Sequence, residues 1–254
     1  RFREFGDMQE LIYVVGNEQN YHFQVLRLIL KKLGYNWADR IYHMSYGMVE
    51  LPEGKMKSRE GTVVDADDLM ESMLQDSIAI SNELGKLSGL TPQEAAIVHE
   101  TIAQGALKYF ILKVEPRKTM LFNPKESIDF NGNTGPFIQY TYARISSVLR
   151  KAAQNNIDIS AIVPHIECNE KEREVLKQLS RYSEAIEIAG KEHAPSHIAN
   201  YVYDLVKVYN QFYHDCSILN EEFADIRLYR LQLSKQVACT IQSAMRLLGI
   251  QVPE

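Results

Sequence analysis

The stretch LIYVVGNEQNYHFQVLRLILKKLGY, from Leu11 to Tyr35, decides the fold expected for the first part of this chain. Its opening run is apolar, partly β-branched and ended by Gly16, which predicts a buried strand. Apolar side chains then recur at helical spacing, at Phe23, Leu26, Ile29, Leu30 and Leu33. Gly34 stands where a glycine commonly ends a helix. We therefore expect a strand followed directly by a helix.

A second strand-like run, RIYHMSYGMVEL, extends from Arg40 to Leu51. Strand, helix and strand over this length predict a βαβ unit of a parallel sheet. Such sheets bind ligands at the carboxyl ends of their strands. Gly16–Gln19 and the loop around Lys55 should both lie at that edge.

That loop lies within LPEGKMKSREGTVVDADDL, from Leu51 to Leu69. Lys55, Lys57 and Arg59 fall within five residues between two glycines, and an acidic run then opens a helix. A glycine-bounded cationic loop suits a polyanion that arrives and leaves, such as a triphosphate. The alternative is a solvated turn between a strand and a helix.

After Val64 the pattern is helical. One amphipathic helix carries Leu69, Met73, Ile80, Leu84 and Leu87 and stops at Gly89. A second begins at Thr91, with Pro92 at its first position and Glu94 completing a capping box, and Pro116 ends it. The Gly/Asn/Pro-rich residues 118–136 are the expected domain boundary.

From Phe137 onward the spacing predicts an all-helical bundle. Its last helix has one apolar face, made of Tyr229, Leu233, Val237, Ile241, Ala244 and Leu248.

Composition is that of an ordinary soluble globular protein, with 45% apolar and 24% charged residues among 254. The net charge of −5 disfavours a nucleic-acid partner, but the charges are segregated. Residues 135–156 and 226–250 contain no Asp or Glu. They contain the cations Arg144, Arg150, Lys151, Arg227, Arg230, Lys235 and Arg246. Such segregation can create a positive surface on an acidic protein.

The three cysteines, Cys168, Cys216 and Cys239, are far apart and form no CxxC pair. This argues against a disulfide framework or a zinc site and fits a reducing cytoplasm. No apolar run reaches membrane-spanning length, and no secretory leader is seen. The chain starts at Arg1 in the middle of a pattern, so we expect it to be a piece of something longer.

Four stretches together resemble one family. GKMKSREGT (54–62) is similar to the KMSKS signature of class I aminoacyl-tRNA synthetases. IYVVGNEQNYHF (12–23) resembles the GxxQ–xxHF turn of arginyl-tRNA synthetases. FNGNTGPFIQYTYARISSVLRKA (130–152) and RLYRLQLSKQVACTIQSAMRLLGIQVPE (227–254) resemble the opening element and closing helix of that family's anticodon-binding domain. The resemblance covers nearly the whole chain, in order, and indicates the carboxyl-terminal portion of an arginyl-tRNA synthetase.

The resemblance implies an α/β remnant over residues 1–64, which is the second half of a Rossmann-type parallel sheet with its KMSKS-like loop. A helical connecting region over 65–130 and a mostly all-α, DALR-type anticodon-binding bundle over 131–254 would follow. It implies an arginine–tRNA ligase that uses ATP, with Mg²⁺ as phosphate counter-ion and no protein-bound metal. The partners would be arginine and tRNA(Arg), without a membrane, and the protein a cytoplasmic monomer.

Site roles follow from the resemblance residue by residue. Gln19 would bind the arginine substrate, because an amide serves its ammonium or guanidinium without adding charge. Gly16, Glu18 and His22 would bind ATP, as would Met56 of the loop. Lys55, Lys57 and Ser58 would stabilise charge on the α-phosphate and the leaving pyrophosphate. Arg59 would be either a phosphate contact or a loop anchor.

In the helical part, Phe137, Tyr140 and Arg144 lie at i, i+3 and i+7, on one helical face. The resemblance makes them the anticodon-binding row, in which aromatic rings stack on an unpaired base and the cation meets a phosphate. Core packing at a helix start is the alternative. Gly132, Asn133 and Gly135 would shape the turn before this helix, and Tyr201, Tyr203, Tyr209 and Tyr213 would be core or groove wall.

The chain departs from the family pattern in ways that predict inactivity alone. It has no HxGH motif, and Ser58 stands where the second lysine of the signature is expected, with Lys57 one place earlier. Three other readings stay open: a cysteinyl-type synthetase, a non-catalytic tRNA- or RNA-binding helical module, and a helical scaffold without an RNA role.

Overall fold

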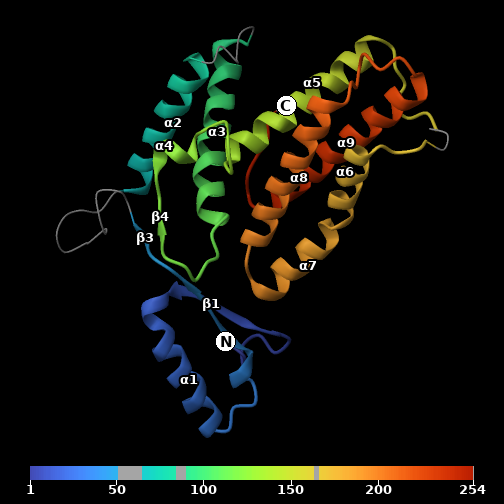
Figure 1. Cartoon of the computed structure of the whole chain (residues 1–254). Coiled ribbons are helices and arrows are strands. Elements are labelled where there is room, and N and C mark those ends of the chain that lie inside the picture. The colour runs from blue at the N-terminus through green and yellow to red at the C-terminus, as the bar shows by residue number, and fades with distance from the viewer. Residues whose placement is uncertain (51–64, 84–89, 163–165, 254) are drawn as a thin grey trace. The chain divides into compact units, whose positions relative to one another are not determined.

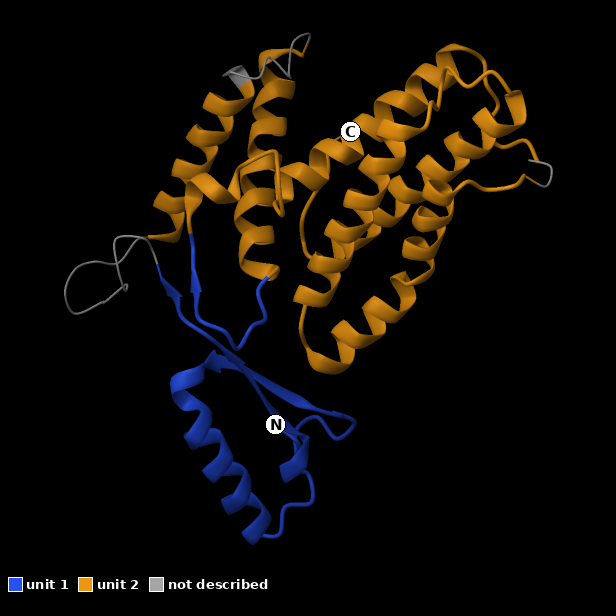
Figure 2. Cartoon of the chain, in the orientation of Figure 1, with its two compact units in different colours: residues 1–63, 114–122 blue, residues 64–113, 123–254 orange. Residues whose placement is uncertain are grey.

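The computed structural model describes residues 1–50, 65–83, 90–162 and 166–253 (Figure 1). The chain divides into two compact units, shown in different colours in Figure 2. Unit 1 comprises residues 1–63 and 114–122, and unit 2 comprises residues 64–113 and 123–254.

Unit 1 opens with the predicted βαβ unit. Its elements are β1 (Leu11–Gly16), the short 3₁₀ turns η1 (Asn17–Gln19) and η2 (Ala38–Arg40), α1 (Asn20–Lys32) and β2 (Ile41–Tyr46). Strands β1 and β2 pair in parallel, with Leu11 opposite Ile41 and Gly16 opposite Tyr46. The helix ends at the glycine stop, since Gly34 has a positive φ of 82°. The prediction of a parallel strand–helix–strand unit is confirmed.

The prediction that β1 is buried is wrong. Ile12 and Val14 are 41% and 65% exposed, and Leu33, directly after α1, is 66% exposed. Among the described residues β1 pairs only with β2. One helix packed on a two-stranded sheet cannot cover both faces of the sheet, so β1 stays exposed. The apolar run identified the strand correctly but did not reveal how much of it is covered.

A second, very short sheet joins two distant segments of unit 1. Strand β3 (Val49–Glu50) pairs in parallel with β4 (Met120–Leu121). Strand β4 lies within residues 65–130, which were expected to form a helical connection. The approach is close: the Gly47 amide donates to the Pro116 carbonyl at 2.7 Å. A Cβ on Gly47 would lie 2.2 Å from the Lys118 carbonyl oxygen, so only glycine fits there.

Within its described residues, unit 2 contains helices joined by turns and no strand. Its elements are α2 (Ala66–Glu83), α3 (Pro92–Leu112), α4 (Pro124–Ser127), α5 (Gly135–Gln154), α6 (Glu170–Ser180), α7 (Tyr182–Glu192), α8 (Ser196–Asp215) and α9 (Ala224–Leu247). Helix α3 begins with the predicted capping box, in which Thr91 and Glu94 cap one another's backbone. Helix α2 is described as far as Glu83, and the predicted stop at Gly89 lies outside the described residues.

The bundle core lies between α5, α8 and α9, which Figure 1 shows side by side. Most of the predicted apolar face of α9 is buried there, as Val237, Ile241 and Ala244 are fully buried. The hydroxyl of buried Tyr109 on α3 lies 2.6 Å from Asn133 Oδ1 and 2.9 Å from the Ala199 carbonyl oxygen. This contact ties α3 to α8 and to the turn that precedes α5.

Candidate functional site

The carboxyl end of β1 brings four of the predicted site residues onto one turn. Gly16 ends the strand, Glu18 and Gln19 form η1, and His22 lies in the first turn of α1. The side chains of Glu18, Gln19 and His22 are exposed. A Cβ on Gly16 would lie 3.8 Å from the ring of Tyr46, which is an ordinary van der Waals distance. Contact with Tyr46 therefore does not require a glycine at this position. The loop residues Lys55, Met56, Lys57, Ser58 and Arg59 lie outside the described residues.

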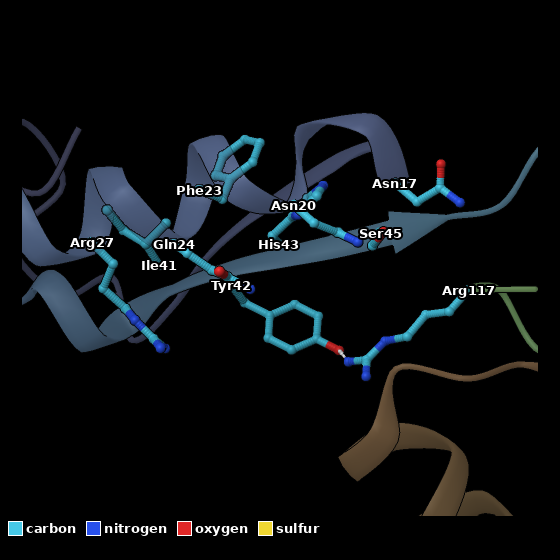
Figure 3. A pocket seen from close by; sticks show the side chains of 10 residues that line it. All are labelled: Asn17, Asn20, Phe23, Gln24, Arg27, Ile41, Tyr42, His43, Ser45 and Arg117. Atoms are coloured by element: carbon cyan, nitrogen blue, oxygen red, sulfur yellow. Dashed lines mark hydrogen bonds between the residues drawn. The ribbon is translucent and has the colours of Figure 1, made fainter.

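A pocket of about 420 Å³ lies beside this turn, between α1 and β2 (Figure 3). Its walls include Asn20, Gln24 and Arg27 from α1, and His43 and Ser45 from β2. Neither Gly16, Glu18, Gln19 nor His22 lines it. Sequence reasoning missed this pocket because its residues come from separate segments and form no motif.

In unit 2 the structure brings Tyr140 and Arg144 together. The Arg144 guanidinium carbon lies 4.8 Å from the centre of the Tyr140 ring and 5.1 Å from that of Tyr213. Arg144 Nη1 also donates to Asn210 Oδ1 at 2.9 Å. The guanidinium is therefore held between two rings and an amide. Phe137, the first residue of the predicted row, packs instead toward Tyr203, with ring centres 6.0 Å apart.

Helix α8 contributes Asn210 to this cluster, a residue that was not part of the predicted row. Asn210 Nδ2 donates to Thr141 Oγ1 at 3.0 Å, while its oxygen accepts from Arg144. Asn210 thus links two positions of α5 and fixes the orientation of Arg144. Among the tyrosines predicted to be core or groove wall, Tyr201 and Tyr209 are buried, whereas Tyr203 and Tyr213 are half-buried. Burial raises the pKa of Tyr209, so that hydroxyl stays protonated.

The turn before α5 has the structural character expected of it. Gly132 adopts a positive φ of 87°, and Thr134 caps the helix by accepting from the Phe137 amide at 3.3 Å. A Cβ on Gly135 would lie 2.3 Å from the Gly105 carbonyl oxygen, because α5 crosses α3 at this glycine pair.

The basic surface expected along α9 is smaller than its charge count predicts. Arg230 is 9% exposed, and its guanidinium meets Glu172 at 2.8 Å and Glu221 at 2.6 Å. Burial acts to lower the pKa of Arg230, but the two carboxylates outweigh it and raise that pKa. Acids distant in sequence therefore neutralise this cation, while Lys235 and Arg246 remain exposed.

Within the described ranges, no group of three or more His, Cys, Asp or Glu side chains is arranged to hold a metal ion. The cysteines Cys168, Cys216 and Cys239 are free. Across residues 1–50, 65–83, 90–162 and 166–253, no helix combines the length and apolar character needed to cross a membrane.

Comparison with known proteins assigns the two parts of the chain separately. Residues 2–123 match the model of the class I (R) tRNA synthetase catalytic domain, and residues 138–254 match the DALR anticodon binding domain. The chain is 59% identical over 254 residues to an arginine–tRNA ligase of Flavobacterium psychrophilum and 60% identical over 255 residues to one of Bacteroides fragilis. It is covered completely in both comparisons and spans 42% of each relative's length.

A solved structure agrees with these matches. The arginyl-tRNA synthetase of Thermus thermophilus superimposes with a TM-score of 0.82 and 28% sequence identity. The superposition covers 97% of this chain and 41% of that one.

Proposed function

Because the chain belongs to the arginyl-tRNA synthetase family, we propose that it is part of an arginine–tRNA ligase, which activates arginine with ATP and transfers it to tRNA(Arg). The observation that carries this proposal is the succession of two matches in one chain. A catalytic-domain match over residues 2–123 precedes an anticodon-domain match over residues 138–254. A protein built this way handles both chemical activation and tRNA recognition.

The small parallel sheet of unit 1 would be one half of a Rossmann-type sheet, carried by residues 1–64. Its support is the apolar surface left uncovered on β1 and α1, where Val14, Tyr21 and Leu28 are at least 60% exposed. Apolar surface of this extent on a strand and helix suits packing against further sheet and helices. The regions 65–130 and 131–254 would be the helical connection and the anticodon-binding domain.

Within the catalytic half, Gln19 would bind arginine, and Gly16, Glu18 and His22 would bind ATP together with Met56. The exposed side chains of η1 support these roles, because the side chains of Glu18 and Gln19 have no hydrogen-bond partner among the described residues. Lys55, Lys57 and Ser58 would stabilise the phosphate charge that develops as pyrophosphate leaves, with Mg²⁺ as a counter-ion. We also propose that the protein acts as a cytoplasmic monomer.

In the bundle, Tyr140 would stack on an unpaired anticodon base and Arg144 would contact an adjacent phosphate. The geometry supports this pairing, since ring and guanidinium lie 4.8 Å apart and both side chains remain partly exposed. Phe137 would complete the surface at the start of α5, although its ring also packs toward Tyr203.

The catalytic part of the proposal is tested by arginine-dependent exchange of pyrophosphate into ATP. A full-length protein that contains this sequence should catalyse the exchange, whereas the 254-residue chain alone should not, because the HxGH motif is absent from it. Robust exchange by the chain alone would contradict the proposed division of the ATP site. No exchange by the full-length protein, with arginine and tRNA(Arg) supplied, would contradict the proposed activity.

A further inference from the structure

The pocket between α1 and β2 has the side-chain chemistry of an anion site. It is lined by two arginines, by amide side chains, by His43 and by Ser45 (Figure 3). Among the described residues, no Asp or Glu lines it. This is unusual in a chain whose acids outnumber its Lys and Arg residues by 33 to 28. The pocket therefore offers hydrogen-bond donors and positive charge without a carboxylate to compete for them.

The two arginines are available to a ligand. Arg27 is exposed and has no ion pair with any described residue. The nearby cation Lys31, on the same helix, is already paired with Asp39 at 2.6 Å. Arg117 reaches the pocket from the segment before β4, and its only described contact is a 3.3 Å hydrogen bond to the Tyr42 hydroxyl. Figure 3 shows Tyr42 between the two guanidinium groups, so they approach the pocket from different sides.

A buried hydroxyl in the pocket wall points independently to a ligand. Ser45 is 6% exposed, and its Oγ has no hydrogen-bond partner within the described part of the chain. Buried polar side chains are normally hydrogen-bonded, so an unpaired one that lines a pocket calls for a partner from outside. The neighbouring His43 is already fixed, with Nε2 3.1 Å from the Val15 carbonyl oxygen and its ring stacked on Phe23 at 4.2 Å.

We propose that this pocket binds a phosphate group, held by the guanidinium groups of Arg27 and Arg117 and by the Ser45 hydroxyl. A phosphate offers oxygens in several directions, which suits donors that lie on different sides of the pocket better than a planar carboxylate does. The pocket borders the turn of the proposed ATP contacts through Asn17 and Asn20, but Gly16, Glu18 and His22 do not line it. The phosphate could belong to an RNA backbone or to a free ion or nucleotide, which share this chemistry.

The test is a pair of NMR titrations of the whole chain, read at the side-chain Nε–H resonances of its arginines. One titration uses inorganic phosphate, and the other uses a short oligouridylate without terminal phosphates. Both are repeated with Arg27→Gln, with Ser45→Ala and with Lys32→Gln. Lys32 is an exposed cation of α1 outside the pocket, so its substitution removes the same charge without touching the site.

We expect saturable shifts at Arg27 and Arg117 with at least one probe. Arg27→Gln should weaken the affinity read at Arg117 about tenfold, as for one charge-assisted hydrogen bond. Ser45→Ala should weaken it by a smaller factor, while Lys32→Gln should change it by less than about twofold. A response to phosphate alone indicates a free ion or nucleotide, and a response to RNA alone indicates a backbone diester. No saturable shift with either probe, or equal effects of Arg27→Gln and Lys32→Gln, would overturn the proposal.

Discussion

Arg144 shows how the fold holds a side chain that we propose to contact a phosphate. Its guanidinium lies over Tyr140, near Tyr213, and donates to Asn210. A side chain held in this way loses little conformational freedom when a ligand binds. Its other N–H groups have no partner among the described residues and can face a phosphate. The sequence placed Arg144 and Tyr140 on one face, but the contribution of α8 depends on packing between residues 66 positions apart.

Arg144→Ala should weaken binding to any anticodon arm and lower the salt dependence by about one counter-ion, because it removes the proposed phosphate contact. Tyr140→Ala should cost about 1–3 kcal/mol of binding free energy through lost stacking, with a smaller change in salt slope. Fluorescence titration at several salt concentrations separates the two effects. Arg150→Ala, an exposed cation on the same helix, is the matched control. If both variants bind like the unmodified chain, the row is core packing.

His99 on α3 should make unit 2 less stable in acid. It is 7% exposed, its Nδ1 has no partner within the described residues, and burial lowers its pKa. The unfolded state, with a histidine pKa of about 6.5, then binds more protons than the folded state. Stability should therefore fall as pH drops below about 6.5 and continue to fall toward the folded-state pKa.

The check is urea unfolding of the chain at several pH values between neutral and mildly acidic. His99→Gln should flatten the pH dependence, because glutamine cannot take up the proton. His214→Gln is the control, at a side chain that is 88% exposed and paired only with the neighbouring Asp215, and it should change the pH dependence much less. An equally steep pH dependence in His99→Gln would show that other groups cause it.

At the scale of elements, the sequence predicted helix ends correctly where a few neighbouring residues determine them. The capping box at Thr91 and Glu94 and the glycine stop at Gly34 depend on a few neighbouring residues, and both are present. Strands β3 and β4 have two residues each, too few to show any periodicity, and their pairing joins segments about 70 residues apart. The exposure of β1 likewise depends on what packs against the strand and not on the strand itself.

The crossing of α3 and α5 should be sensitive to one methyl group. A Cβ on Gly135 would lie 2.3 Å from the carbonyl oxygen and 2.7 Å from the carbonyl carbon of Gly105. Both are backbone atoms, so Gly135→Ala must push the helices apart, at a cost of about 1–3 kcal/mol in unfolding free energy. Gly190→Ala on α7 is the control, since nothing lies within 4 Å of its added Cβ. It should stabilise by up to about 1 kcal/mol.

Urea denaturation followed by far-UV circular dichroism gives both values. Equal stability of Gly135→Ala and the unmodified chain would mean that α3 and α5 do not meet at this glycine pair.

For the molecule as a whole, some candidate site residues are close together in the sequence, and others are brought together only by the fold. The turn from Gly16 to His22 and the row on α5 are continuous in sequence, so their members could be named in advance. The α1–β2 pocket combines a helix, a strand and Arg117, which lies more than 70 residues beyond that strand. The basic surface along α9 was overestimated for the same reason, because Glu172 and Glu221 reach Arg230 only in the fold.

In a full-length protein, Lys55→Ala or Lys57→Ala should lower turnover more than arginine affinity. Charge on the α-phosphate and pyrophosphate develops mainly in the transition state, and one such contact is typically worth about 10²–10³-fold in rate. Steady-state ATP–pyrophosphate exchange gives kcat and KM separately. A rise in KM for arginine with kcat unchanged would make the loop a binding element only.

Binding of the anticodon arm of arginine tRNA to this chain tests the central claim most directly. A labelled anticodon stem-loop of tRNA(Arg) should bind the 254-residue chain with an affinity that falls as salt rises. A stem-loop with the same stem and a scrambled loop should bind more weakly at every salt concentration, because unpaired bases are recognised by stacking and by their edges. Equal affinity for the two stem-loops, or no binding to either at low salt, would contradict the account.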